Sequence, residues 1–403
     1  RLLTTRYLLG LFDGSEYDKI PYSVVECKEH IDEALKMARK SCVLLKNDGV
    51  LPIDKTKVNT IGVIGPNADS RAALIGNYHG TSSEYITVLE GIREEAGDDV
   101  RILYSQGCDL YKDKVENLAW DQDRISEAVI TAENSDVVIL CVGLNETLEG
   151  EEGDTGNSDA SGDKVDLHLP KVQEELIEKV TAVGKPTIVV LMAGSAIDLN
   201  YAQDNCNGIL LAWYPGARGG RAVADLLFGK ESPSGKLPVT FYKDLEGMPE
   251  FTDYSMKNRT YRYMEKEALY PFGYGLTYSD TCVTEAEVVG EVSAESDIML
   301  KATVKNNGTV DTDEVVQVYI KDLDSPLAVR NYSLCGFKRV SLKAGEEKSV
   351  EFTISNKAMN IVDEDGNRYI AGKHFRLFAG VSQPDTRSAE LTGHKPAEVE
   401  IAL

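Results

Sequence analysis

The stretch DVVILCVGLNETLEGEEGD, residues 136–154, decides the fold of this chain. Residues 136–144 form a nearly continuous apolar run, which is the pattern of a parallel strand covered on both faces. A glycine-bearing turn follows at once, with four carboxylates, at Glu149, Glu151, Glu152 and Asp154. In open α/β sheets, ligands bind beyond the carboxyl ends of the strands. The sequence therefore predicts a buried strand that leads directly into an acidic ligand-binding turn.

The crowding of these carboxylates suggests one kind of chemistry. Like charges repel, so a carboxyl group among them keeps its proton to a higher pH. A carboxylic acid that is protonated near neutrality can protonate the leaving group when a glycosidic bond is cleaved. A solvated acidic loop without a catalytic role has the same composition. The residues alone leave both interpretations open.

The strand at 136–144 belongs to a longer α/β alternation. Short apolar runs predict five strands, at Thr60–Ile64, Val100–Tyr104, Asp136–Val142, Thr187–Met192 and Ile209–Trp213. Amphipathic helices are predicted between them, for example over 125–132 and 172–180. Another helix begins at His30, with Ile31 and Cys42 on one face. This alternation predicts a mostly parallel sheet sandwiched by helices.

The pattern changes after Ser279. Period-two alternation predicts strands over 299–303, 315–319, 350–354 and 375–379, separated by turn signals. Short alternating strands at this spacing indicate a β-sandwich of about 100 residues. We therefore expect three parts, a linker over 1–29, an α/β domain over 30–280 and an all-β sandwich over 281–403.

The composition excludes several classes of function. The net charge of −23 argues against binding to nucleic acid or to an anionic membrane surface. No apolar run approaches the ~20 residues that span a bilayer. The seven cysteines lack C-x-x-C spacing and the five histidines lack metal-ligand spacing, so we expect neither a disulfide framework nor a metal site. The scattered thiols leave the compartment open, with a mild preference for a reducing cytoplasm.

Further segments are candidates either for binding or for packing. The loop Gly76–Gly80 carries Asn77, Tyr78 and His79, which suit either a sugar site or a structural turn. The turn Trp213–Gly220 is interpreted as a sheet-edge turn that packs domains together. Tyrosine-rich segments at 251–255, 261–263 and 270–275 suit sugar rings or a domain interface. Residues 64–68 lack G-x-G-x-x-G, and Pro66 removes an amide donor, so we expect no nucleotide loop.

Six segments together, in order, resemble the C-terminal part of glycoside hydrolase family 3, the exo-acting β-glucosidases and β-xylosidases. They are 42–52, 76–80, 147–154, 213–220, 234–241 and 270–279. The resemblance covers essentially the whole chain. It implies an α/β sandwich followed by a fibronectin-III-like domain, with a (β/α)₈ barrel before them in the family.

The resemblance also implies how the chemistry is divided. The barrel supplies an aspartate nucleophile, and the α/β sandwich supplies a glutamate as general acid/base. In β-xylosidase-like members that glutamate is the second of a Thr-x-Glu-x-Glu stretch, with Asp three residues on. Thr147, Glu149, Glu151 and Asp154 match this pattern. Glu151 is therefore the predicted acid/base, with Glu149 and Glu152 as rivals. The Arg that often follows the Asp is replaced by Thr155, which starts an insertion over 156–164.

A barrel needs about 250 residues, and none precede Arg1. Residues 252–254 superficially resemble the nucleophile motif, but they lie in the tyrosine-rich segment, so Asp253 is rejected as nucleophile. We expect a separate or preceding barrel half as partner, and no hydrolysis by this chain alone. The expected substrates are oligosaccharides or aryl β-glycosides, with glucose or xylose undecided and no cofactor. A homo-oligomer is possible. The alternative is a non-catalytic carbohydrate-binding or scaffold protein.

Overall fold

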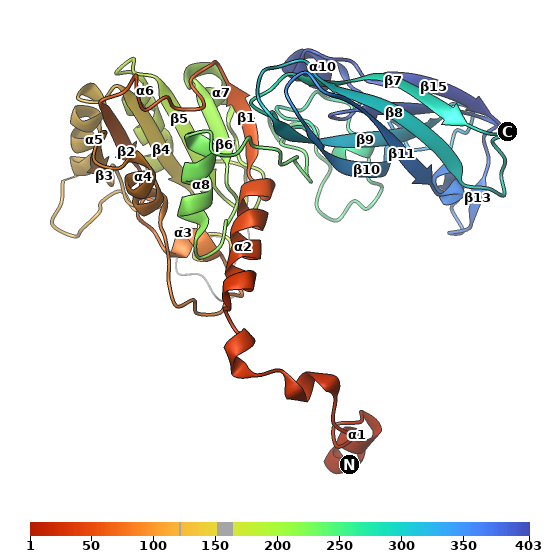
Figure 1. Cartoon of the computed structure of the whole chain (residues 1–403), viewed down its shortest axis with the longest axis horizontal. Coiled ribbons are helices and arrows are strands. Elements are labelled where there is room, and N and C mark those ends of the chain that lie inside the picture. The colour runs from red at the N-terminus through yellow and green to blue at the C-terminus, as the bar shows by residue number, and fades with distance from the viewer. Residues whose placement is uncertain (121, 151–163) are drawn as a thin grey trace.

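The computed structural model describes residues 1–120, 122–150 and 164–403. An α/β unit and a β-sandwich lie side by side, and an N-terminal segment extends away from both (Figure 1). That segment holds the helix α1 (Leu2–Leu8) and two short 3₁₀ turns, Glu16–Lys19 and Tyr22–Val24. In the part of the chain that is described, no helix has both the length and the apolar character needed to cross a membrane.

The α/β unit is built on a six-stranded sheet with the order β1-β6-β5-β4-β2-β3. Its strands are β1 (Val43–Asn47), β2 (Thr60–Ile64), β3 (Arg101–Ser105), β4 (Val137–Gly143), β5 (Thr187–Met192) and β6 (Gly208–Leu211). All neighbours are parallel except β1, which runs antiparallel to β6 at the edge. The predicted mostly parallel sheet is confirmed.

The sequence did not predict β1, and the assignment of Cys42 to a helix is wrong. The helix α2 (Lys28–Ser41) ends one residue earlier, and Cys42 caps it. Val43 then pairs with Leu211 at the start of the edge strand. Cys42 is fully buried, so its apolar character reflects the sheet rather than a helix face.

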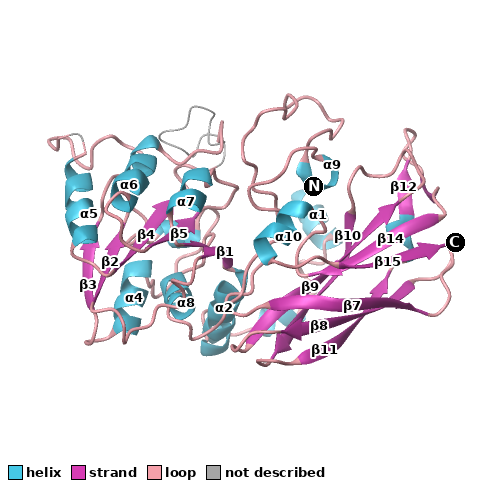
Figure 2. Ribbon diagram, turned by 90° about the horizontal axis from the view of Figure 1, so that it is seen from above, coloured by secondary structure: helices cyan, strands magenta, loops and turns pink. Residues whose placement is uncertain are grey.

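Helices cover both faces of the sheet (Figure 2). On one face lie α5 (Asp123–Glu133), α6 (Lys171–Thr181) and α7 (Asn200–Asn205), and on the other lie α2, α4 (Val88–Ala96) and α8 (Gly219–Leu227). Side chains alternate between the faces of a strand. In β4, Val138 and Leu140 accordingly join one core and Ile139 the other. The continuous apolar run of β4 is the result, because burying each such side chain stabilises the fold by about 1.5–3 kcal/mol.

The second unit is an antiparallel β-sandwich. One sheet has the order β10-β9-β14-β15 and the other β11-β8-β7. Their strands are β7 (Thr281–Val289), β8 (Ile298–Asn306), β9 (Thr312–Asp322), β10 (Ser333–Leu342), β11 (Glu347–Ile354), β14 (His374–Gly380) and β15 (Ala397–Ala402). A small hairpin of β12 (Asn360–Val362) and β13 (Arg368–Ile370) and the helix α10 (Thr386–Thr392) complete it. The predicted all-β sandwich is confirmed, and the four predicted strands lie within β8, β9, β11 and β14. The residue boundaries expected between the parts stay a prediction.

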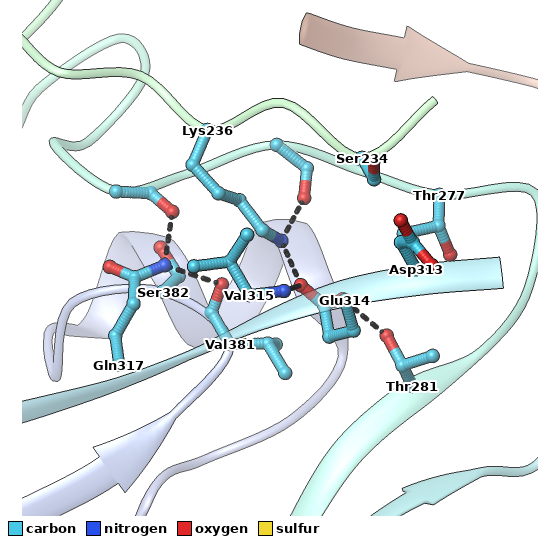
Figure 3. Close-up of polar contacts among 12 residues, drawn as sticks. Ser234, Lys236, Thr277, Thr281, Asp313, Glu314, Val315, Gln317, Val381 and Ser382 are labelled. Carbon is cyan, nitrogen blue, oxygen red and sulfur yellow. Dashed lines mark hydrogen bonds and ion pairs between the residues drawn. The ribbon is translucent and has the colours of Figure 1, made fainter. Parts of the chain in front are cut away.

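A buried ion pair joins the two units (Figure 3). Lys236, from the loop after α8, lies 2.8 Å from an oxygen of Glu314 on β9, and both side chains are almost completely buried. Lys236 also donates to the Gly275 carbonyl at 2.7 Å. The other oxygen of Glu314 accepts from the Thr281 hydroxyl at 2.6 Å. Both charges are therefore compensated where the units meet.

Aromatic side chains also meet between the two units. Tyr261, in the short helix α9 (Thr260–Tyr263), stacks on Phe272 and meets the edge of Tyr319 on β9. Two of the tyrosine-rich segments thus form the interface between the units, which was one of the two roles considered for them. The segment at 251–255 does not, because Phe251 is 86% and Tyr254 83% exposed.

Candidate active site

Four loops meet at one edge of the α/β sheet. The strands β2, β4, β5 and β6 are parallel, so their carboxyl ends lie together. The loops that follow them carry Asn67, Glu149, Ser195 and Tyr214. Asn67 is buried and donates from Nδ2 to the Leu144 carbonyl at 3.1 Å, which ties the loop after β2 to the loop after β4. The acidic turn therefore begins at the predicted edge of the sheet.

The carboxylate of Glu149 is held by the two neighbouring loops. Its Oε2 accepts from the backbone N–H of Gly194 at 2.7 Å and from the hydroxyl of Tyr214. Its Oε1 accepts from the hydroxyl of Ser195. Hydrogen bonds to an ionised carboxylate are roughly twice as strong as neutral ones. Glu149 therefore anchors the acidic turn to the loops after β5 and β6.

The surroundings of Tyr214 keep its hydroxyl a hydrogen-bond donor to Glu149. Burial, followed by the nearby charge of Glu149, raises the pKa of its phenol, so the hydroxyl remains a donor. Its ring lies over two glycines. A Cβ on Gly76, where φ is +59°, would come within 2.6 Å of Cδ2 of the ring, and one on Gly194 within 3.0 Å of Cε2. The ring reaches Glu149 only because these two positions have no side chain.

A lysine completes the network. Lys164 donates from Nζ to the hydroxyl of Ser195 and to the carbonyl of Ala196, both at 2.9 Å. Burial lowers the pKa of Lys164, and the charge of Glu149 opposes that shift. A cation is thus placed next to Glu149 across a shared hydroxyl. It comes from the far end of the insertion at 156–164, where the sequence departs from the family pattern.

The roles of the other predicted site residues stay predictions. Glu151 and Glu152 lie outside the described residues, so their roles stay predictions. In the Gly76–Gly80 loop, the side chain of Asn77 accepts from the backbone of Tyr78 at 2.9 Å, and Nδ1 of His79 lies 2.9 Å from the Gly80 carbonyl. Tyr78 and His79 are exposed, and the loop adjoins the site through Gly76. Its role in substrate binding stays a prediction.

Sequence reasoning missed Ser195, Tyr214 and Lys164. Tyr214 was visible in the segment Trp213–Gly220, but that segment was interpreted only as a packing turn. A polar residue directly after a buried strand was the available signal for Ser195. No sequence pattern pointed to Lys164, because its contact with Ser195 depends on the path that the chain takes after the insertion. Across the described ranges, no three metal-ligating side chains gather in a way that could hold a metal ion.

The sheet and the adjoining sandwich agree with comparisons to known proteins. The C-terminal domain of glycosyl hydrolase family 3 matches residues 42–278. This chain belongs to glycosyl hydrolase family 3. A fibronectin type III-like domain matches residues 314–383 of this family 3 chain. The resemblance found in the sequence is thereby confirmed.

Named relatives of the family 3 chain are glycosidases. A β-xylosidase of Formosa agariphila is 36% identical and aligns with 97% of this chain and 54% of its own length. The solved structure of a β-glucosidase from Erythrobacter marinus has a TM-score of 0.79 and 32% identity, over 94% of this chain and 51% of that one. An exo-β-xylosidase solved with a xylobiose aziridine probe has a TM-score of 0.82 and 26% identity, over 99% of this chain and 52% of that one. The family 3 chain thus spans about half the length of these relatives.

Proposed function

We propose that this chain is the acid/base-bearing half of a retaining exo-β-glycosidase that releases terminal β-linked glucose or xylose. The observation that carries the proposal is the acidic turn, which is fixed through Glu149 at the carboxyl edge of the sheet in a family 3 C-terminal domain. The names of the relatives support the same class of reaction. The substrates are oligosaccharides or aryl β-glycosides.

The partner in this proposal is a (β/α)₈ barrel, in the same parent chain or a separate one. Retaining cleavage needs two carboxyl groups about 5–5.5 Å apart, one as nucleophile and one as acid/base. The relatives extend over about twice the aligned length, which leaves room for a barrel of about 250 residues. The barrel would supply the nucleophile and most of the contacts to the cleaved sugar.

Glu151 is our choice for the acid/base. A general acid must be free to give its proton to the leaving oxygen and then to take one from water. Both oxygens of Glu149 already accept hydrogen bonds from Gly194, Ser195 and Tyr214, so its proton transfer would disrupt the anchor of the turn. Glu152 is the remaining rival, next to Glu151 in the same turn.

The test compares single Glu→Gln variants of all three positions in the assembled enzyme. A missing general acid costs about 10²–10⁴-fold in rate. Glu151→Gln should lose that much with an alkyl β-glycoside and much less with a nitrophenyl β-glycoside, because an activated leaving group needs less protonation. Glu149→Gln and Glu152→Gln should affect both substrates alike. The assignment fails if Glu151→Gln leaves both substrates unaffected.

The proposal as a whole is tested with nitrophenyl β-glucoside and β-xyloside. Hydrolysis should occur when this chain is combined with its barrel half and not with the chain alone, and the faster substrate identifies the sugar. If the halves associate but neither substrate is cleaved, the chain is a carbohydrate-binding or scaffold protein instead.

A further inference from the structure

A hollow of about 610 Å³ lies in the fibronectin-III-like unit and shares no lining residue with the Glu149 network. It is bordered by the helix α9, by the strands β9 and β10, and by the small hairpin of β12 and β13. Ligand sites in proteins have volumes of about 300–1,000 Å³, with a mainly apolar lining and a few oriented polar groups. The hollow therefore has room for one small ligand.

Three cations line the hollow, Arg262, Lys357 and Arg368. All three are exposed, and no carboxylate of the described residues lies within ion-pair distance of them. By contrast, Arg330, in the loop before β10, pairs with Glu265 at 3.3 Å. The chain as a whole carries a charge of −23, but salt screens exposed charges beyond about 8 Å. An anion in the hollow is therefore governed by these three cations rather than by the net charge.

One carboxylate also lines the hollow, at Asp322 near the end of β9. Its Oδ1 accepts from the backbone N–H groups of Asp324 at 2.9 Å and Ser325 at 3.0 Å. Its Oδ2 is buried and has no hydrogen-bond partner among the described residues. A Cβ on Gly372 would lie 2.2 Å from Oδ1, so the carboxylate keeps this position only beside a glycine. A ligand hydroxyl that donates to Oδ2 would satisfy a group that is costly to leave unpaired.

The rest of the lining is mainly apolar. Ile361 and Phe375 belong to the buried core of the sandwich, whereas Leu327 is 46% and Val362 52% exposed. Sugar rings combine an apolar face with a rim of hydroxyl groups. The exposed leucine and valine offer a surface to such a face, in the same hollow as the cations and the unpaired carboxylate oxygen.

We propose that this hollow binds an anionic sugar, a pyranose that carries one carboxylate or phosphate group. The anionic group faces Arg262 and Arg368, because a guanidinium matches either anion with two parallel hydrogen bonds. A ring hydroxyl donates to Oδ2 of Asp322, and the ring face lies against Leu327. A simple anion has no hydroxyl for Asp322, and a neutral sugar leaves the cations unpaired. The site is independent of the proposed function, since no residue of the acidic turn takes part in it.

Titration calorimetry on this chain with four ligands tests the proposal. Methyl β-glucuronide and glucose 6-phosphate join a pyranose to a negative charge, whereas methyl β-glucoside lacks the charge and inorganic phosphate lacks the ring. One of the anionic sugars should bind at least about tenfold more tightly than the glucoside and than phosphate, because only it makes both kinds of contact. The tighter of the two shows whether the site prefers a carboxylate or a phosphate group. The proposal is overturned if neither anionic sugar binds at millimolar concentration, or if the glucoside or phosphate binds as tightly.

A pair of variants locates the binding. Arg368→Gln should weaken binding of the tighter ligand about tenfold by removing a charged donor, and Tm should not change, because Arg368 is exposed and makes no ion pair with a described residue. Arg376→Gln is the control, because it removes the same charge from β14 outside the hollow, where Arg376 already pairs with Glu400. Equal losses of affinity in the two variants, or no loss in either, would overturn the proposal. Failure of the assembled enzyme to cleave any glycoside would instead refute the proposed function and leave this binding result standing.

Discussion

The ion pair between Lys236 and Glu314 should dominate the coupling between the two units. The Glu314 side chain is 2% exposed, and its oxygens accept from Lys236, from the Thr281 hydroxyl and from the backbone of Val315 at 2.6–2.8 Å. The substitution Glu314→Gln removes the charge and puts amide hydrogens where donors already point. Lys236 then stays buried without its counter-charge. Breaking one partner of a buried pair lowers the free energy of unfolding by about 3–5 kcal/mol.

The assay is equilibrium unfolding in urea together with a thermal scan. For a domain of 150–250 residues, 1 kcal/mol shifts Tm by about 2–4 °C, so we expect a fall of roughly 6–20 °C. The fibronectin-III-like unit should also begin to unfold separately, because the pair joins it to the α/β unit. The double variant Lys236→Met/Glu314→Leu should recover most of the loss, since an apolar pair avoids the desolvation of both charges.

A surface pair in the same sandwich provides the control. Arg376 on β14 contacts Glu400 on β15, with side chains 36% and 65% exposed. Exposed pairs contribute about 0–1 kcal/mol, so Glu400→Gln should leave the unfolding midpoint nearly unchanged. If Glu314→Gln lowers the free energy of unfolding no more than this control does, burial of the ion pair does not determine the stability of the interface, and the reasoning is refuted.

Three further predictions concern other parts of the chain. Gly91→Ala should lower the free energy of unfolding by about 1–3 kcal/mol, because a Cβ there would lie 2.2 Å from the Gly220 carbonyl oxygen; an unchanged urea midpoint would contradict the close packing of α4 on α8. Tyr214→Phe should lower kcat/KM of the assembled enzyme about tenfold by removing one hydrogen bond to Glu149, and kinetics equal to those of the parent enzyme would exclude a positioning role. Burial raises the pKa of Asp385 above 3.8, so from about pH 4 upward the folded chain holds a proton that the unfolded chain has lost. Stability should therefore fall as the pH rises through the folded pKa, and Asp385→Asn should flatten that slope in unfolding measured from pH 4 to 7; a slope that the variant leaves intact would assign it to other groups.

The parts of the fold that could be predicted are those in which the local sequence pattern directly reflects how the side chains are buried in the folded protein. β2 and β5 were predicted to the residue, because both faces of these strands are buried and every side chain is therefore apolar or small. β1 was missed because Lys46 and Asn47 interrupt its apolar run at the sheet edge. β10 was missed for a similar reason, since most of its residues are only partly buried or exposed.

The candidate site likewise has a part that the local sequence predicts and a part that it does not. The acidic turn was recognisable because its carboxylates are adjacent in sequence and follow a strand of unmistakable pattern. Tyr214 and Ser195 lie 65 and 46 residues from Glu149 along the chain, so no local pattern connects them with it. These side chains reach Glu149 because parallel strands bring their carboxyl ends to one edge of the sheet.

The sequence by itself determined the α/β alternation, the acidic turn after its strand at 136–144, and the sandwich that follows, because periodicity and composition are local properties. Only the tertiary structure decided which donors hold Glu149, that Lys164 stands beside it, and that Lys236 is neutralised by Glu314 across the domain junction. These contacts depend on the order and direction of strands and on the few ångströms that separate loops in space. Hydrogen bonds and ion pairs require such distances, and residues far apart in the chain reach them only after the core has packed.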